Sequence, residues 1–131
     1  MLKQGVIPAD LTHLTSCYEF KHLLAAGVLP SGLAHLTFGY TYNTPLVADT
    51  LPVGLTHLTF GRMLDQPLAV GVLSAGLTHL TFGSYFSTSL AVRVLPAGLT
   101  DLALGSAFDH LLSHASCLGQ QFVLASLWWW V

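Results

Sequence analysis

Apolar and polar residues alternate over short stretches of this chain, and the stretches recur at a constant interval. In a typical stretch, LTHLTFG at residues 55–61, polar His57 and Thr59 alternate with apolar Leu58 and Phe60. Successive side chains of a strand point to opposite faces, so we expect Leu58 and Phe60 to face a core and His57 and Thr59 to face away from it. The pattern therefore predicts one short, half-buried strand in each copy of the stretch.

The interval between copies is 22 residues throughout the chain. Five units follow one another without insertion or deletion, at residues 5–26, 27–48, 49–70, 71–92 and 93–114. One unit cannot bury its own apolar face, whereas stacked units pair their strands and share one core. We therefore expect a mainly β fold with little helix: a right-handed, leucine-rich-repeat-like solenoid with one parallel sheet and one short strand per 22-residue coil. The chain, 1–131, is expected to be a single repeat domain, with residues 115–131 as a C-terminal cap or tail.

Other positions recur in register with the predicted strand. A glycine in the turn before the strand is expected to supply φ freedom, at Gly32, Gly54, Gly76 and Gly98. A second glycine is expected to let the chain bend away after the strand, at Gly39, Gly61, Gly83 and Gly105. Two large apolar residues per unit are expected to fill the convex half of the core: Phe20, Tyr42, Leu64, Phe86 and Phe108, then Leu24, Leu46, Leu68, Leu90 and Leu112.

The segment LPVGLTHLTFGRMLDQPLAVGVLSAGLTHLTFG, at residues 51–83, resembles the FNIP repeat, a leucine-rich-repeat-like family with 22-residue units. The resemblance covers about residues 5–114. Its Phe-Asn-Ile-Pro-type segment corresponds to Tyr-Asn-Thr-Pro at 42–45 and Leu-Asp-Gln-Pro at 64–67, whereas 86–89 and 108–111 lose the proline. Ser16-Cys17 replaces Phe-Gly in the first unit. The resemblance implies a solenoid that interacts with other proteins, and it implies no catalytic residues.

The composition narrows the function classes. Only 8% of the 131 residues are charged and the formal net charge is −2. The four basic residues, Lys3, Lys21, Arg62 and Arg93, are scattered. Nucleic-acid binding and polybasic membrane docking both need a basic patch, so we expect neither. We expect no transmembrane span, because the apolar runs in the tail, 115–131, which lacks Asp, Glu, Lys, Arg and His, fall short of about 20 residues.

Cysteine use and the N-terminal residues bear on the compartment. Cys17 and Cys117 belong to opposite ends of the predicted solenoid. A disulfide needs two Cα atoms within about 7 Å, so we expect two free thiols in a reducing compartment. The first residues, MLKQGVIPADLTHL, lack the apolar core of a secretory signal. Together these features favour an intracellular protein.

The outward positions of the predicted strands form the candidate partner-binding face. Histidine and threonine repeat there in two columns, His13, His35, His57 and His79 with Asp101, and Thr15, Thr37, Thr59 and Thr81. The leading interpretation is a polar, weakly charged surface on which a protein partner binds. That interpretation rests on the fold class.

Four alternatives remain open for the same columns: a metal site, a pH-responsive binder, an ice- or carbohydrate-binding array, and a solvated polar column. Imidazoles about 4.8 Å apart could share zinc or copper, although a linear column converges poorly on one ion. Neighbouring imidazolium charges repel, so the column would also favour neutral histidine and make the protein less stable at acidic pH. A regular threonine array could bind ice or carbohydrate. The simplest alternative is a solvated polar column copied with each repeat.

Catalytic motifs give no support for an enzyme. The chain has no G-x-S-x-G elbow, H-E-x-x-H, C-x-x-C or phosphate-binding loop. His110 and His114 would share one helix face, but the end of the last coil is the simpler interpretation of that spacing. We therefore expect a non-enzymatic protein with no cofactor and no metal.

The tail ends in three consecutive tryptophans, Trp128, Trp129 and Trp130. A solenoid exposes a core cross-section at each end, so residues 115–131 are expected to cap the last coil. A partner or membrane anchor and a non-native reading-frame end are the alternatives. Exposed end coils could also pair edge to edge, which would give self-association.

Overall fold

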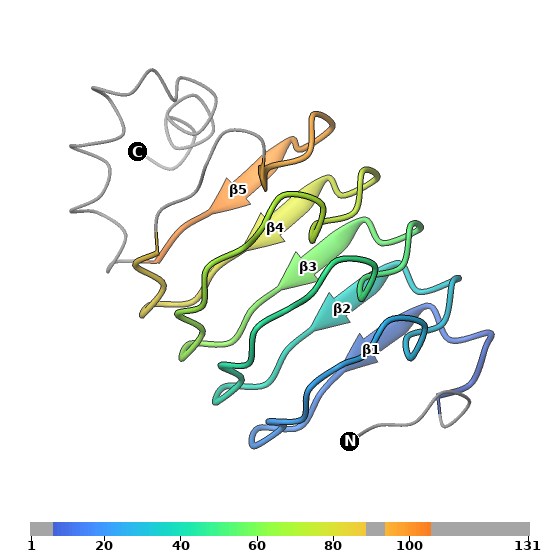
Figure 1. Cartoon of the computed structure of the whole chain (residues 1–131), viewed down its shortest axis with the longest axis horizontal. Coiled ribbons are helices and arrows are strands. Elements are labelled where there is room, and N and C mark those ends of the chain that lie inside the picture. Colours follow the sequence, from blue (N-terminus) through green and yellow to red (C-terminus); the bar gives the residue numbers. More distant parts are fainter. Residues whose placement is uncertain (1–6, 89–93, 106–131) are drawn as a thin grey trace.

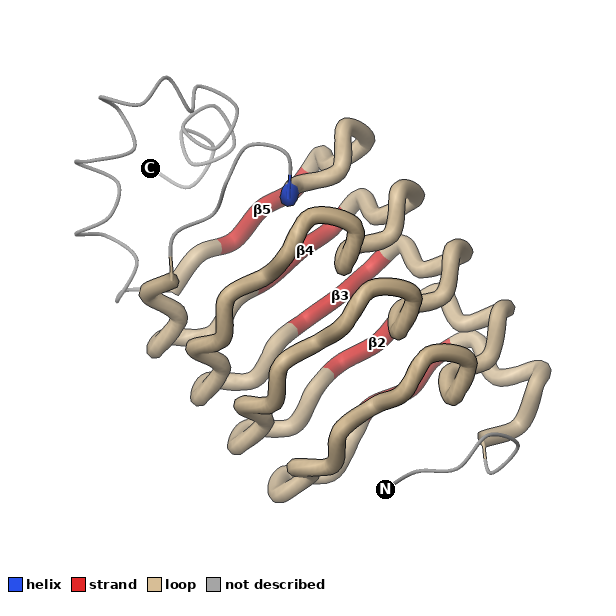
Figure 2. The backbone as a smooth tube through the Cα atoms, in the orientation of Figure 1, coloured by secondary structure: helices blue, strands red, loops and turns tan. Residues whose placement is uncertain are grey.

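The computed structural model describes residues 7–88 and 94–105, and within them five strands form one parallel sheet. The strands are β1 (His13–Thr15), β2 (His35–Thr37), β3 (His57–Thr59), β4 (His79–Thr81) and β5 (Asp101–Ala103). They lie side by side in sequence order, one per coil (Figure 1). The returns between them consist of turns and extended segments without an α-helix in the described residues (Figure 2). The predicted solenoid with one parallel sheet is confirmed.

The register of the sheet follows the 22-residue period without a slip. Leu36 pairs with Leu14 on one side and Leu58 on the other, and Leu80 continues the row. Leu36, Leu58 and Leu80 are at most 2% exposed. A one-residue slip would turn this leucine row to solvent, so burial of the row fixes the register.

The two sides of each coil fill one continuous core, as the sequence predicts. Phe38, Phe60 and Phe82 follow the strands and are 3% exposed. The convex side contributes a column of large side chains, Tyr42, Leu64 and Phe86, and a column of leucines, Leu24, Leu46 and Leu68, all buried. Burial without a hydrogen-bond partner for the hydroxyl raises the pKa of Tyr42 to about 12.

The turn before each strand is also repeated. The N–H of Leu55 donates to the carbonyl oxygen of Pro52 at 3.1 Å, and the same bond closes the turns before Leu33, Leu77 and Leu99. Ser74 replaces proline in the fourth coil, and its buried hydroxyl donates to the carbonyl oxygen of Leu55 at 3.1 Å. This hydrogen bond allows serine to be buried at a position where the other coils have proline, which has no polar side-chain group.

The roles expected for the glycines need correction. Left-handed φ angles occur at the first position of the unit, with 79° at Gly27, 66° at Asp49 and 89° at Gly71. They do not occur at the turn glycines such as Gly54, so the prediction that this column needs positive φ is wrong. The glycine that follows the strand is required by close approach, because a Cβ on Gly61 would lie 1.9 Å from the carbonyl oxygen of Gly39.

A side-chain ladder joins the convex returns. Asn43 Oδ1 accepts the N–H of Asp65 at 2.9 Å, and Asp65 Oδ1 accepts the N–H of Ser87 at 2.9 Å. The Ser87 N–H holds the pKa of Asp65 below its usual value. Asn43 and Asp65, which match the Asn of the Phe-Asn-Ile-Pro-type segment, therefore each satisfy a backbone donor of the next coil.

Several predictions concern residues outside the described ranges. They are the end of the fifth unit with His110 and His114, Cys117, the tail 115–131 and its three tryptophans. Cys17 is described and is an exposed free thiol. Within the described residues, no helix is long and apolar enough to cross a membrane.

Candidate binding face

The strands bring all nine predicted face residues together in two neighbouring rows. The register pairs His13, His35, His57, His79 and Asp101 in one row, and Thr15, Thr37, Thr59 and Thr81 in the other, which ends at Ala103. Both rows flank the buried leucine row, so they lie on the face directed away from the core. The alternation expected from the sequence is confirmed.

The imidazoles form a continuous stack. Ring centroids are 4.1 Å apart for His13 and His35, 4.2 Å for His35 and His57, and 4.1 Å for His57 and His79. The interplanar angles are 8°, 18° and 9° in the same order. The rings thus lie closer together than the strands themselves, which are about 4.8 Å apart.

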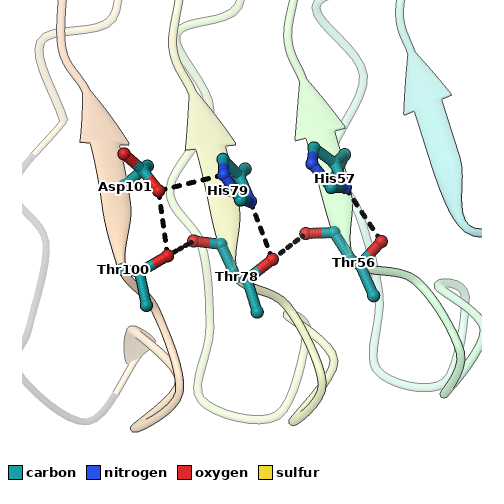
Figure 3. Close-up of polar contacts among 6 residues, drawn as sticks. All are labelled: Thr56, His57, Thr78, His79, Thr100 and Asp101. Carbon is teal, nitrogen blue, oxygen red and sulfur yellow. Dashed lines mark hydrogen bonds and ion pairs between the residues drawn. The ribbon is translucent and has the colours of Figure 1, made fainter.

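A second threonine row orients these rings. The hydroxyl of Thr56 donates to the carbonyl oxygen of Ala34 at 3.1 Å, and its oxygen lies 2.9 Å from Nδ1 of His57. Thr78 makes the same two contacts with the carbonyl oxygen of Thr56 and with His79 (Figure 3). This row was not predicted from the sequence, although the threonine directly before the histidine in GLTHL is a signal for it.

The second coil lacks this support. Ala34 occupies the position of the threonine, and Nδ1 of His35 is buried without a hydrogen-bond partner. An unsatisfied buried nitrogen costs about 1–3 kcal/mol. His35 is therefore held mainly by its stacked neighbours, His13 and His57.

The fifth coil ends the column with a carboxylate. Oδ2 of Asp101 lies 2.9 Å from Nε2 of His79 and 2.9 Å from the hydroxyl of Thr100 (Figure 3). The two side chains are 45% and 65% exposed, so this contact, which is an ion pair only when His79 is protonated, is a surface interaction of small energy. The pair still shows how the outer nitrogen of a column histidine meets an acidic group.

The pKa of His57 is lowered from its usual value. Burial is the main cause, followed by the charges of His79 and His35, while Asp101 acts in the opposite direction. Protonation of the column is therefore resisted at its centre. The direction of the shift agrees with the preference for neutral histidine that the sequence suggests.

The hydroxyls of the outer threonine row have no hydrogen-bond partner within the described part of the chain. No hydrogen bond joins the hydroxyls of Thr15, Thr37, Thr59 and Thr81 to any other described residue, in contrast to the row that orients the histidines. Thr37, Thr59 and Thr81 are half-buried, so each hydroxyl is held on a strand yet open to solvent. Such groups can donate to and accept from a partner without breaking a bond in the protein.

The metal alternative finds no support in this geometry. A tight zinc site needs three or four ligands that converge on one point. Among the described residues, no group of three or more His, Cys, Asp or Glu side chains is arranged to hold a metal ion. The parallel stack explains this, because its rings are aligned along a line.

A row of aromatic and basic side chains lies in the turns that follow the strands and was not anticipated from the sequence. The rings of Tyr18 and Tyr40 stack at 4.8 Å. The Arg62 guanidinium carbon lies 5.8 Å from the ring centroid of Tyr40 and 5.3 Å from that of Tyr85. Tyrosine and arginine are enriched in protein interfaces. The 22-residue spacing of Tyr18, Tyr40 and Arg62 was the signal that could have revealed the row.

Comparisons with known proteins agree with this architecture. A family model described as the FNIP repeat matches residues 1–41, 42–85 and 65–107. A solved structure described as CroV588, a novel circular LRR protein structure, is 39% identical with a TM-score of 0.80. The match covers 82% of this chain and 16% of that one, so the chain spans about a sixth of that protein. No curated protein matches the chain.

Proposed function

Because this chain belongs to the FNIP repeat family, we propose that it is a non-enzymatic scaffold that binds another protein. The binding surface in this proposal is the histidine–threonine face, meaning the two rows that run from His13 to Asp101 and from Thr15 to Thr81. Solenoids of this class commonly bind partners along an extended sheet. The fold supplies the analogy, and the chemistry of the face must supply the specificity.

The observation that carries the proposal is the difference between the two threonine rows. Thr56 and Thr78 use their hydroxyls inside the protein, whereas Thr37, Thr59 and Thr81 leave theirs unpaired within the described residues. The unpaired hydroxyls sit on paired strands, so little conformational entropy is lost when a partner binds them. The arrangement is therefore a preorganised row of hydrogen-bonding groups.

The stacked histidines add a second row of polar atoms beside the hydroxyls. Nδ1 of His13, His57 and His79 is turned toward a threonine hydroxyl. Contact with Asp101 engages the opposite ring nitrogen of His79. Hydroxyl groups of a partner can donate to the corresponding nitrogen of the histidines that precede it, which is an acceptor when the imidazole is neutral and Nδ1 carries the proton. The exposed row of Tyr18, Tyr40 and Arg62 would extend the surface with residues typical of interfaces.

The test compares partner capture by three forms of the protein. The face variant carries Thr37→Val, Thr59→Val and Thr81→Val, which removes three hydroxyls and keeps β-branched side chains on the strands. The control variant carries Ser31→Ala, Val53→Ala and Ala75→Ser at exposed turn positions of the same three coils. All three forms should have similar melting curves, because neither set removes an internal hydrogen bond.

We expect quantitative mass spectrometry to find at least one partner that the wild type and the control capture and the face variant loses. Direct titration of that purified partner should then show binding weakened about tenfold or more by the face variant, since three hydrogen bonds of about 0.5–1.5 kcal/mol each are removed. A partner that binds the face variant as tightly as the wild type would contradict the proposal.

A further inference from the structure

The phenylalanine column of the core is interrupted in the first coil. Phe38, Phe60 and Phe82 stack in register, with ring centroids 5.4 Å apart in both pairs and interplanar angles of 4° and 16°. The equivalent residue of the first coil, 22 positions before Phe38, is Ser16. A side chain much smaller than a phenyl ring therefore ends the stack.

A pocket of about 170 Å³ lies beside Ser16 at the β1 end of the core. Its walls include Leu14, Phe20 and Leu24 of the first coil and Leu36 and Phe38 of the second. Leu14 and Phe20 are half-buried, whereas their counterparts Leu36 and Tyr42 are at most 2% exposed. Among the described residues, the first coil thus leaves core surface uncovered where the next coils close it.

The one polar side chain in the wall is already engaged. Ser16 Oγ accepts the N–H of Gly39 at 2.7 Å and lies 3.5 Å from the carbonyl oxygen of Thr37. The remaining lining residues are apolar. The pocket therefore offers a ligand apolar contact and an aromatic face, and little polar recognition.

We propose that this pocket binds one small apolar aromatic molecule, of the size of benzene or toluene, stacked on the ring of Phe38. Shape supports this ligand class, because an apolar cavity of about 150 Å³ is large enough to hold benzene. The phenylalanine column supports the orientation, because a ring at this place continues a stack that the protein already forms. The site is separate from the histidine–threonine face, so each proposal can fail without the other.

The experiment is a titration of the full chain with benzene, followed by methyl NMR. In the wild type we expect saturable shifts of the methyl groups of Leu14, Leu24 and Leu36, and NOEs from benzene protons to Phe38. The melting temperature should rise with benzene concentration, because the ligand binds only the folded state. Absence of saturable shifts in the wild type would overturn the proposal.

Two substitutions at one position provide the matched comparison. Ser16→Phe should place a ring in the pocket, weaken benzene binding at least tenfold and raise the melting temperature of the free protein. Ser16→Ala removes the hydroxyl and keeps the space, so it should bind benzene at least as well as the wild type. Equal binding by Ser16→Phe and Ser16→Ala would overturn the assignment to this pocket.

The NMR data keep the proposal testable if Ser16→Phe does not fold. NOEs from benzene to Leu14 and Phe38 in the wild type would then locate the ligand without any substitution. NOEs from these side chains to residues 1–6 that persist at saturating benzene would show that the chain itself fills the pocket, which would also overturn the proposal.

Discussion

Ala34 stands where the other four coils have threonine, at Thr12, Thr56, Thr78 and Thr100. In each of those coils the threonine hydroxyl contacts the next residue, which belongs to the histidine column or is Asp101. Thr56 shows what the hydroxyl does: it donates to the carbonyl oxygen of the preceding coil and meets the histidine Nδ1. The buried Nδ1 of His35 has no such partner. The local fold accepts this defect because the backbone of Ala34 still donates to the carbonyl oxygen of Thr12 at 2.8 Å.

The first prediction is that Ala34→Thr stabilises the protein. The new hydroxyl should give His35 Nδ1 a partner and donate to the carbonyl oxygen of Thr12, so the free energy of unfolding should increase by about 0.5–1.5 kcal/mol. Urea unfolding monitored by circular dichroism measures the change. Ala34→Val is the control, because it adds a β-branched side chain without a hydroxyl. An equal gain from valine would assign the effect to strand propensity.

The second prediction concerns the glycine that follows the strand. Gly61→Ala should destabilise the protein by more than about 2 kcal/mol, because its Cβ would overlap the backbone of Gly39 and force the two coils apart. Gly32→Ala is the control, since the nearest atom to its Cβ would be 3.8 Å away. Chemical denaturation of both variants gives the comparison. A small effect of Gly61→Ala would mean that the coils can separate at little cost.

At the scale of the strand, the repeat pattern was sufficient to predict the sheet. Each strand is only three residues long, and its burial alternates as the sequence of His, Leu and Thr requires. The same pattern predicted the two rows in which the nine face residues align, because a constant 22-residue period leaves one register. Their role as a binding face stays a prediction. Both the alternation and the period can be read directly from the sequence, without knowing how the coils contact one another.

The contacts between coils were beyond the reach of the pattern. The ladder from Asn43 to Asp65 and the close approach at Gly61 depend on distances between neighbouring returns. Periodicity says which residues lie over one another, but it does not say how closely. For this reason the roles expected for the glycines were not met. The pocket beside Ser16 also depends on the distances between its lining residues, so periodicity did not predict it.

The histidine stack makes the stability of the sheet depend on pH. Burial and the neighbouring imidazoles lower the pKa of His57 in the folded state, and the groups that act on it are His79, His35, Asp101 and His13. Between the folded-state pKa and about 6.5, the unfolded chain holds more proton at this site than the folded protein. The stabilising contribution is therefore present above about pH 6.5 and is lost as the pH falls through the folded-state pKa.

The third prediction is a melting temperature a few degrees lower at about pH 5 than at about pH 7.5. Replacing the central ring in His57→Gln should reduce the difference, because it removes the group whose pKa is lowered. Asp101→Asn should increase the difference, since its carboxylate opposes the repulsion within the column. Thr59→Val, on the same strand, should leave the difference unchanged. Equal melting temperatures at both pH values in the wild type would contradict the effect of the stack.

At the scale of the whole molecule, each coil contacts its neighbours in sequence, so the sheet has two ends. β1 pairs with β2 on one side, and no described strand pairs with its other side. An unpaired strand edge is a template for pairing with another chain. The similar solved structure is described as a circular LRR protein, and this chain spans 16% of it.

The fourth prediction is that the protein self-associates through the β1 edge as its concentration rises. Sedimentation velocity over a wide concentration range should show a reversible increase in mass. Thr15→Lys places a charge on the edge strand and should weaken the association, because lysine on an edge disfavours strand pairing. Thr59→Lys puts the same charge in the middle of the sheet, on the same face. If both variants weaken the association equally, the contact lies on the face and the edge is not its site. A wild type that stays monomeric at every concentration would contradict the prediction of edge pairing.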